Sequence, residues 1–246
     1  MTAAARPRAS PARRTHARAR LLVPALFLCS AAPAAAEVGA AVSIFSDARF
    51  RGYSLSGGRP VAIADLSYDD PGGLYGAFSA SAVLGNDDGI RPLAFQLNGG
   101  FAKQVRPDLA LDLGVIHSSY SRYASRGSNN YTEVYAGVRR KAIAARVAYS
   151  PHYFEAGART LYGELDAELS PAPKLRLNGH FGLLFWLDYP YEEKPPTQHD
   201  WRIGASREVG PVSLHLIVTG GGPGRDYYRG RWHSRTALVA GLSWPL

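Results

Sequence analysis

Residues 161–187 alternate between apolar and polar side chains in two consecutive runs, and this period of two constrains the fold more than any other feature. Successive side chains of a β-strand point to opposite faces, so each run presents one apolar and one polar face. The runs are separated by Ser-Pro-Ala-Pro-Lys at 170–174, and proline interrupts a hydrogen-bonded ladder. The pattern therefore predicts a long antiparallel hairpin.

The same alternation recurs about a dozen times between residues 38 and 246. Twelve tilted strands that span a membrane use roughly 110–130 residues, at about 9–11 residues each. The expected connections alternate in length: those near 70, 107, 140, 172 and 210 are short, and those near 56, 88, 125, 154, 193 and 226 are longer on the whole. Outer-membrane barrels combine short periplasmic turns with longer outer loops. We therefore predict an all-β fold, a closed antiparallel transmembrane β-barrel of about twelve strands.

A soluble β-sandwich or solenoid is the alternative fold, because soluble sheets show the same alternation with the apolar face turned to a core. A sandwich would not explain why Leu, Phe and Trp fill one face of nearly every strand. The barrel accounts for that face as the surface that contacts lipid.

Residues 1–36 have the composition of a secretory signal peptide. Six arginines and no acid precede the apolar run 21–28, and Ala34-Ala35-Ala36 provides a cleavage site before Glu37. We divide the chain into a signal peptide at 1–36 and an outer-membrane barrel at 37–246. This division predicts export to the outer membrane of a Gram-negative bacterium.

Removal of the signal peptide changes the charge and the cysteine content. The formal net charge of +8 falls to about +2, with 22 bases against 20 acids, so the basic balance is no argument for nucleic-acid binding. Cys29 is the only cysteine and lies in the removed segment, which excludes a disulfide framework and a thiolate zinc site. No run after residue 37 has the roughly 18 apolar residues of a spanning helix.

The segment 46–56, Ser-Asp-Ala-Arg-Phe-Arg-Gly-Tyr-Ser-Leu-Ser, resembles the N-terminal signature of the TorF family of proteobacterial outer-membrane porins. The segments 129–137 and 149–157 resemble internal segments of that family. Ala48 stands where the family pattern has an aromatic residue, and the chain ends in Trp-Pro-Leu at 244–246 instead of a terminal aromatic residue. The resemblance implies a porin-like barrel and no particular solute.

The polar phase of the strands should line the barrel interior. A first strand over 38–53 would place Asp47, Arg49 and Arg51 on the lumenal face near the outer mouth. The remaining pore-lining candidates come from four consecutive strands and are Arg146, Glu164, Asp166, Glu168, Arg176, His180 and Arg202. Acids on one strand flanked by bases on both neighbours form cross-strand pairs about 5 Å apart. They act either as a charged wall that selects solutes or as a network that only neutralises the interior.

The sequence does not support catalysis or a metal cofactor. The neighbours His117 and Ser118 point to opposite faces of a strand, and Ser213 and His215 share a face without an obvious acid. The histidines are scattered singly, without metal-ligand spacing. We predict no enzyme activity, no cofactor and no metal site.

The last long loop mixes bases with aromatic residues, namely Arg225, Tyr227, Tyr228, Arg229, Arg231 and Trp232. It could contact lipopolysaccharide or hold an anionic solute at the rim. The other expected partners are outer-membrane lipid, small solutes and the barrel-assembly machinery, without nucleic acid. The predicted function is a porin-like channel for passive diffusion of small solutes. The alternative is a plugged structural or adhesion barrel without transport activity.

Overall fold

The structure is a computed structural model that describes residues 36–85, 89–121, 130–154, 157–188 and 197–246. Nearly all of the signal peptide expected at 1–36 and parts of the loops expected near 88, 125 and 193 lie outside the described residues. The signal peptide therefore stays a prediction. Among the described residues, no helix is long and apolar enough to cross a membrane.

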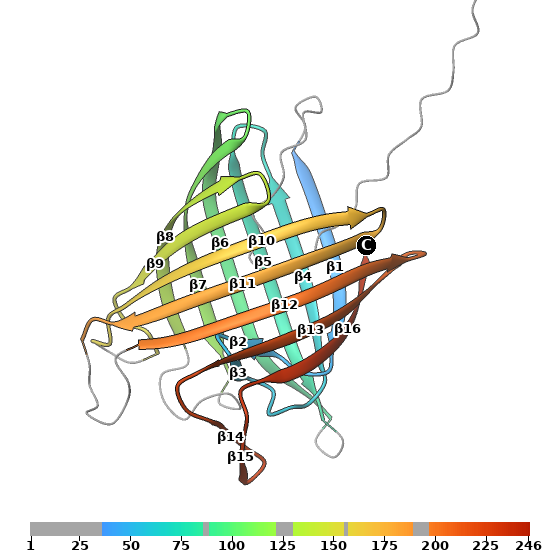
Figure 1. The fold of residues 1–246 in the computed structure, drawn as a ribbon, viewed down its shortest axis with the longest axis vertical. Helices are drawn as coiled ribbons and strands as arrows, with labels where there is room; N and C mark the ends of the chain where they lie inside the picture. Colours follow the sequence, from blue (N-terminus) through green and yellow to red (C-terminus); the bar gives the residue numbers. More distant parts are fainter. Residues whose placement is uncertain (1–35, 86–88, 122–129, 155–156, 189–196) are drawn as a thin grey trace, which may run out of the picture.

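Twelve strands close into one antiparallel barrel, which confirms the predicted fold class and strand count. Each strand pairs with the next barrel strand along the chain, and the last pairs with the first. The near and far walls cross in Figure 1, as strand tilt in a closed barrel requires. The barrel strands are β1 (Glu37–Phe45), β4 (Val61–Asp69), β5 (Leu74–Leu84), β6 (Ile90–Arg106), β7 (Leu109–Tyr120), β8 (Asn130–Arg140), β9 (Ile143–Ser150), β10 (Thr160–Ala172), β11 (Leu175–Trp186), β12 (Thr197–Val209), β13 (Val212–Gly222) and β16 (Ala237–Pro245).

The outer face of the barrel is apolar on all twelve strands, as the alternation predicted. In β7, Leu113 is 60% exposed, whereas its neighbour Asp112 is 3% exposed and faces the interior. Every barrel strand presents at least one exposed large apolar side chain, for example Val38, Leu66, Leu74, Leu97, Leu113, Val134, Val147, Leu165, Phe181, Ile203, Leu216 and Leu238. A continuous apolar surface of this size is suited to lipid, which favours the membrane barrel over the soluble sandwich.

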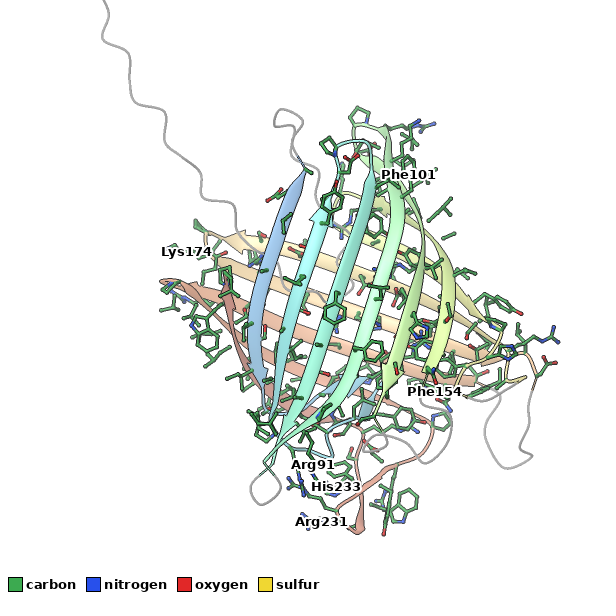
Figure 2. The ribbon with its side chains drawn as sticks, turned by 180° about the vertical axis from the view of Figure 1, so that it is seen from behind. Arg91, Phe101, Phe154, Lys174, Arg231 and His233 are labelled. Atoms are coloured by element: carbon green, nitrogen blue, oxygen red, sulfur yellow. The ribbon has the colours of Figure 1, made fainter. Side chains whose placement is uncertain are left out.

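The connections sort into a turn end and a loop end. The turn end carries the short connections 70–73, 107–108, 141–142, 173–174 and 210–211, together with the start of β1 and the end of β16. The loop end contains the strand ends that flank the connections 46–60, 85–89, 121–129, 151–159, 187–196 and 223–236. Figure 2 shows Lys174 at the turn end and Arg91, Phe154, Arg231 and His233 at the loop end. The predicted alternation of short and long connections is confirmed.

Two of the short turns depend on residues in the left-handed backbone region. Lys141 and Lys174 have φ angles of 53° and 64° in two-residue connections. A positive φ at the first central residue only, as at Lys141, is the pattern of a type II′ turn, and a positive φ at the second only, as at Lys174 after Pro173, is that of a type II turn. The turns therefore join β8 to β9 and β10 to β11 as tight hairpins.

The first strand is shorter than predicted, because β1 ends at Phe45 instead of continuing to residue 53. The following segment 46–60, here called the inner loop, folds into the barrel. It contains a small ribbon of β2 (Arg49–Phe50) and β3 (Tyr53–Ser54). In Figure 1 this ribbon lies between the near and far walls toward the loop end. A second small ribbon, β14 (Asp226–Tyr228) with β15 (Arg231–His233), lies in the connection 223–236.

A close backbone approach explains why the inner loop contains glycine at position 52. Gly52 has a φ of +81°, and a Cβ there would lie 3.0 Å from the Cα of Gly221 in β13. Only glycine tolerates both the left-handed backbone and this contact. The loop thus touches the wall at β13, which is two strands from β1 in the barrel order.

Apolar packing fills the loop end of the barrel around the inner loop. One cluster contains Val61, Val83 and Leu93, all nearly inaccessible, with Leu55 of the inner loop packed against them. A larger aromatic cluster on the neighbouring wall includes Ile116, Tyr120, Tyr131, Tyr135, Ala148, Tyr153, Tyr162 and Leu184, and Phe50 and Leu55 pack against it. The two clusters together hold the inner loop against the wall strands.

Candidate functional site in the barrel interior

A cavity of about 360 Å³ lies inside the barrel beside the inner loop. Its walls come from the inner loop and from most of the barrel strands. Seven of the ten predicted pore-lining residues line it, namely Asp47, Arg49, Arg51, Arg146, Glu164, His180 and Arg202. We take this cavity as the candidate functional site.

Asp47 is the centre of the fold of the inner loop. Its Oδ1 accepts hydrogen bonds from the hydroxyls of Ser54 at 2.6 Å and Ser56 at 2.7 Å. Its Oδ2 accepts one from Nε of Arg49 at 2.5 Å. Short polar side chains that bond to nearby groups compete with strand formation. These bonds explain why the chain turns at this point, although residues 47, 49 and 51 alternate as a strand would.

A second set of contacts ties the inner loop to the connection 223–236. The Oδ2 of Asp226 accepts a hydrogen bond from the backbone N–H of Ser54 at 2.6 Å and lies 3.8 Å from Nη1 of Arg49. The guanidinium of Arg235 lies 3.7 Å from the ring centre of Tyr53 and donates a hydrogen bond to the hydroxyl of Tyr53. Arg49 is therefore held by Asp47 within the inner loop and by Asp226 of the connection 223–236.

Arg51 joins the inner loop to the opposite wall. Its Nη2 lies 2.8 Å and 2.9 Å from the two carboxylate oxygens of Glu133 in β8. Its guanidinium lies 3.7 Å from the ring centre of Tyr162 and 5.1 Å from that of Tyr153. Burial raises the pKa of the Tyr153 phenol, so this neighbour is neutral at ordinary pH. The guanidinium is thus enclosed by one carboxylate and an aromatic wall, which suits its planar shape.

Deeper in the barrel, Arg146 of β9 lies between two acids on neighbouring parts of the wall. Its Nη1 is 3.4 Å from Glu164 and its Nη2 is 3.5 Å from Asp112. The guanidinium also lies 4.2 Å from the ring centre of Tyr135. The register places Arg146 directly opposite Glu164, as the cross-strand charge pattern indicated.

His180 of β11 lies between two carboxylates. Its Nδ1 is 2.8 Å from Asp166 Oδ1, and its Nε2 is 3.1 Å from Asp200 Oδ1. The hydroxyl of Tyr162 donates to the other oxygen of Asp200 at 3.0 Å. Arg202 completes the group at 4.0 Å from Asp166. We call the set Asp112, Arg146, Glu164, Asp166, His180, Asp200 and Arg202 the midwall cluster.

Of the predicted pore-lining residues on the barrel strands, two lie apart from the midwall cluster. Glu168 is exposed and sits opposite Asn178, closer to the turn end. Arg176 is nearer still to that end, and its Nη2 lies 3.4 Å from Glu208 of β12. Arg176 is therefore paired with an acid of β12 instead of the acids of β10, because the register places it beyond them.

Sequence reasoning did not select four acids that belong to the site, Asp65, Asp112, Glu133 and Asp200. Asp112 and Glu133 share the lumenal phase with other interior residues of β7 and β8, so the alternation was the signal that could have identified them. Asp200 follows the long connection expected near 193, and β12 begins at Thr197. The Pro- and Tyr-rich sequence before it hid the start of the strand.

The histidine and serine pairs considered for catalysis have other partners. The Nδ1 of His117 lies 2.9 Å from the hydroxyl of Thr132 in an exposed contact. The two ring nitrogens of His215 face the hydroxyls of Ser206 and Ser243, at 3.0 Å and 2.9 Å. Neither ring nitrogen of His215 is thus available to the orienting carboxylate of a triad.

A closed twelve-stranded barrel with an apolar outside and a charged interior defines the class of porin-type β-barrels. A family model described as "Bacterial protein of unknown function (Gcw_chp)" matches residues 30–223, so the chain belongs to that family. No curated protein matches the sequence.

Solved porin structures share the fold. The NanC porin superposes with a TM-score of 0.60 at 9% identity, covering 84% of this chain and 100% of NanC. The KdgM porin gives a TM-score of 0.50 at 11% identity, covering 85% of this chain and 98% of KdgM. A KdgM structure in complex with disordered oligogalacturonate matches equally well. At such low identity the likeness concerns the fold, and function has to be argued from the interior.

Proposed function

We propose that the protein is an outer-membrane channel for the passive diffusion of small solutes, narrowed at its loop end by the inner loop. The observation that carries this proposal is the charged cavity of about 360 Å³ inside a barrel whose outside is apolar. Barrels of about eight strands are filled by side chains, and those of sixteen leave an open channel. Twelve strands leave room for a lumen, and here the inner loop occupies part of it.

The charges around the cavity favour small neutral or zwitterionic solutes. Five carboxylates and four guanidiniums line it: Asp47, Asp65, Glu133, Glu164, Asp200, Arg49, Arg51, Arg146 and Arg202. A near balance of signs provides no strong field for a polyanion such as the oligogalacturonate bound by KdgM. Both signs lie on the wall close together, which suits solutes that carry an ammonium and a carboxylate group.

Localisation and partners form part of the same proposal. Export through the signal peptide at 1–36 would deliver the chain to the barrel-assembly machinery, and the apolar outer face would then contact outer-membrane lipid. The exposed Tyr227 and Trp232 at the loop end would meet lipopolysaccharide. The resemblance of 46–56, 129–137 and 149–157 to TorF porins supports the same assignment.

A plugged barrel of structural or adhesive function is the second candidate. It is favoured by the extent to which the inner loop fills the loop end, with Arg51 buried against Glu133 and Leu55 in an apolar cluster. In that case the cavity would be closed to solutes from the outer side.

Conductance in planar lipid bilayers distinguishes the two functions. The purified barrel should form small channels, and a variant in which a short Gly-Ser linker replaces residues 47–57 should conduct several times more. Arg140→Ala, which changes only an exposed pair with Asp108 at the turn end, is the matched control and should conduct as the parent does. If neither the parent nor the loop-shortened variant conducts while both remain folded, the channel is excluded.

A further inference from the structure

We propose that Glu164, Asp166 and His180 bind a divalent transition-metal cation, with Zn²⁺ as the representative ion. Each residue offers one ligand atom, and the three atoms lie within 4.8 Å of one another. Asp166 is directly opposite His180 in the β10–β11 ladder, and Glu164 lies two residues along on the same face. The three ligands thus come from two paired strands of a rigid wall.

The far nitrogen of His180 is already held as in a metal site. Its Nε2 lies 3.1 Å from Asp200 Oδ1 and 3.1 Å from the hydroxyl of Tyr162, and that hydroxyl donates a hydrogen bond to Asp200 Oδ2 at 3.0 Å. Metal-binding histidines commonly donate their second ring N–H to a carboxylate, which fixes the tautomer and the ring orientation. With the proton on Nε2, the lone pair of Nδ1 points at Asp166.

The near nitrogen then faces another acceptor. Nδ1 lies 2.8 Å from Asp166 Oδ1, and an ionised carboxylate only accepts hydrogen bonds. Two acceptors at this distance require a cation or a proton between them. Imidazole nitrogen with carboxylate oxygens is a ligand set that suits zinc and related metals better than Mg²⁺ or Ca²⁺.

Neither carboxylate ligand is tightly bound by an arginine. Arg146 lies 3.4 Å from Glu164, and Arg202 lies 4.0 Å from Asp166. Charge-assisted hydrogen bonds between such groups are normally about 2.7–2.9 Å long. The carboxylates of Glu164 and Asp166 can therefore close on a metal without breaking a short ion pair.

The local charge balance also calls for two positive charges. The midwall cluster contains four carboxylates, those of Asp112, Glu164, Asp166 and Asp200, against the guanidiniums of Arg146 and Arg202. The carboxylates thus outnumber the guanidiniums by two in a largely buried place. Unpaired charges in such surroundings are unfavourable, and one divalent cation would neutralise them.

The cavity gives a cation access to the site. Glu164 and His180 both line it, so a hydrated ion in the lumen reaches the ligands directly and keeps water in its remaining coordination positions. The proposal does not depend on transport, because binding is measured on the purified barrel in detergent.

Zinc titration of the chelator-stripped, full-length barrel tests the proposal. Isothermal calorimetry and equilibrium dialysis should give one Zn²⁺ per chain. His180→Gln and Asp166→Asn should each weaken binding at least tenfold. His215→Gln is the matched control, since His215 is also lumenal but bonds to two serines, and it should bind zinc as the parent does.

X-ray absorption spectroscopy of the zinc-loaded parent supplies a readout that needs no variant to fold. It should find a single imidazole nitrogen with oxygen ligands. Absence of stoichiometric binding by the folded parent, a zinc shell with several histidines, or full binding by folded His180→Gln would each overturn the proposal. The first result would mean that a proton, and no metal, lies between His180 and Asp166.

Discussion

One nitrogen of Arg51, in the inner loop, contacts both carboxylate oxygens of Glu133, in the barrel wall 82 residues further along the chain. Both side chains are nearly inaccessible, at 9% and 3% exposure. This pair is a buried polar link between the inner loop and β8. Because the inner loop occupies part of the lumen, this pair helps to determine how wide the lumen is.

Removal of the Glu133 carboxylate should loosen the inner loop. Glu133→Gln leaves the buried guanidinium of Arg51 without its counter-charge, which costs about 3–5 kcal/mol when one partner of a buried pair is lost. We expect a lower free energy of unfolding and larger, noisier channels in planar bilayers. Arg140→Ala, at an exposed pair, should leave the free energy of unfolding almost unchanged.

A double replacement checks that the effect comes from the pair. Arg51→Met combined with Glu133→Leu removes both charges and should recover much of the stability that Glu133→Gln loses. Its channels should still be wider than those of the parent, because the link is absent. Equal stability of the single and double variants would contradict the assigned role of the pair.

The lipid-facing phase can be tested within one strand. Leu165 of β10 is 50% exposed on the outer face, and Glu168 is exposed in the lumenal phase of the same strand. Leu165→Arg, if near the bilayer midplane, should lower the free energy of unfolding in lipid by about 2–4 kcal/mol. Glu168→Arg should change it little, because water reaches that side chain. A larger loss from Glu168→Arg would mean that the inside and outside are reversed.

The orientation of the barrel follows from the unequal connections and can be read by cysteine labelling. Cys29 is the only cysteine, so the barrel residues provide a background without thiols. Arg231→Cys at the loop end should react with a membrane-impermeant maleimide on intact cells, and Lys174→Cys at the turn end should react only after lysis. The opposite labelling would invert the assigned orientation.

The barrel itself could be predicted because the alternation of apolar and polar side chains recurs in strand after strand. Each strand alternates with a period of two, and the unequal connections distinguish the two ends. The same alternation placed Arg146 against Glu164, because directly opposite residues on adjacent strands share a face. The pairing of strands that follow one another in the chain can be predicted from this alternation and from the length of the turn between them.

The inner loop could not be predicted in this way. Residues 47, 49 and 51 imitate a strand, and only the bonds of Asp47 to Ser54 and Ser56 show that the chain turns back. The partners of Arg51 are brought to it by closure of the whole barrel, which no local pattern encodes. Similarly, Arg176 pairs with Glu208 because of the register between β11 and β12. Charge alternation within a strand does not determine that register.

The charge of the cavity wall should set the ion preference of the channel. Arg202 lines the cavity on β12 and is only 4.0 Å from Asp166, so Arg202→Gln removes one positive charge beside an acid. Cations should then pass more readily relative to anions, and the reversal potential in a salt gradient should shift accordingly. Arg207→Gln, on the outer face of the same strand, is the control and should leave the reversal potential unchanged. A shift of equal size in Arg207→Gln, or none in Arg202→Gln while the channel conducts, would show that ions take a path that avoids this cavity.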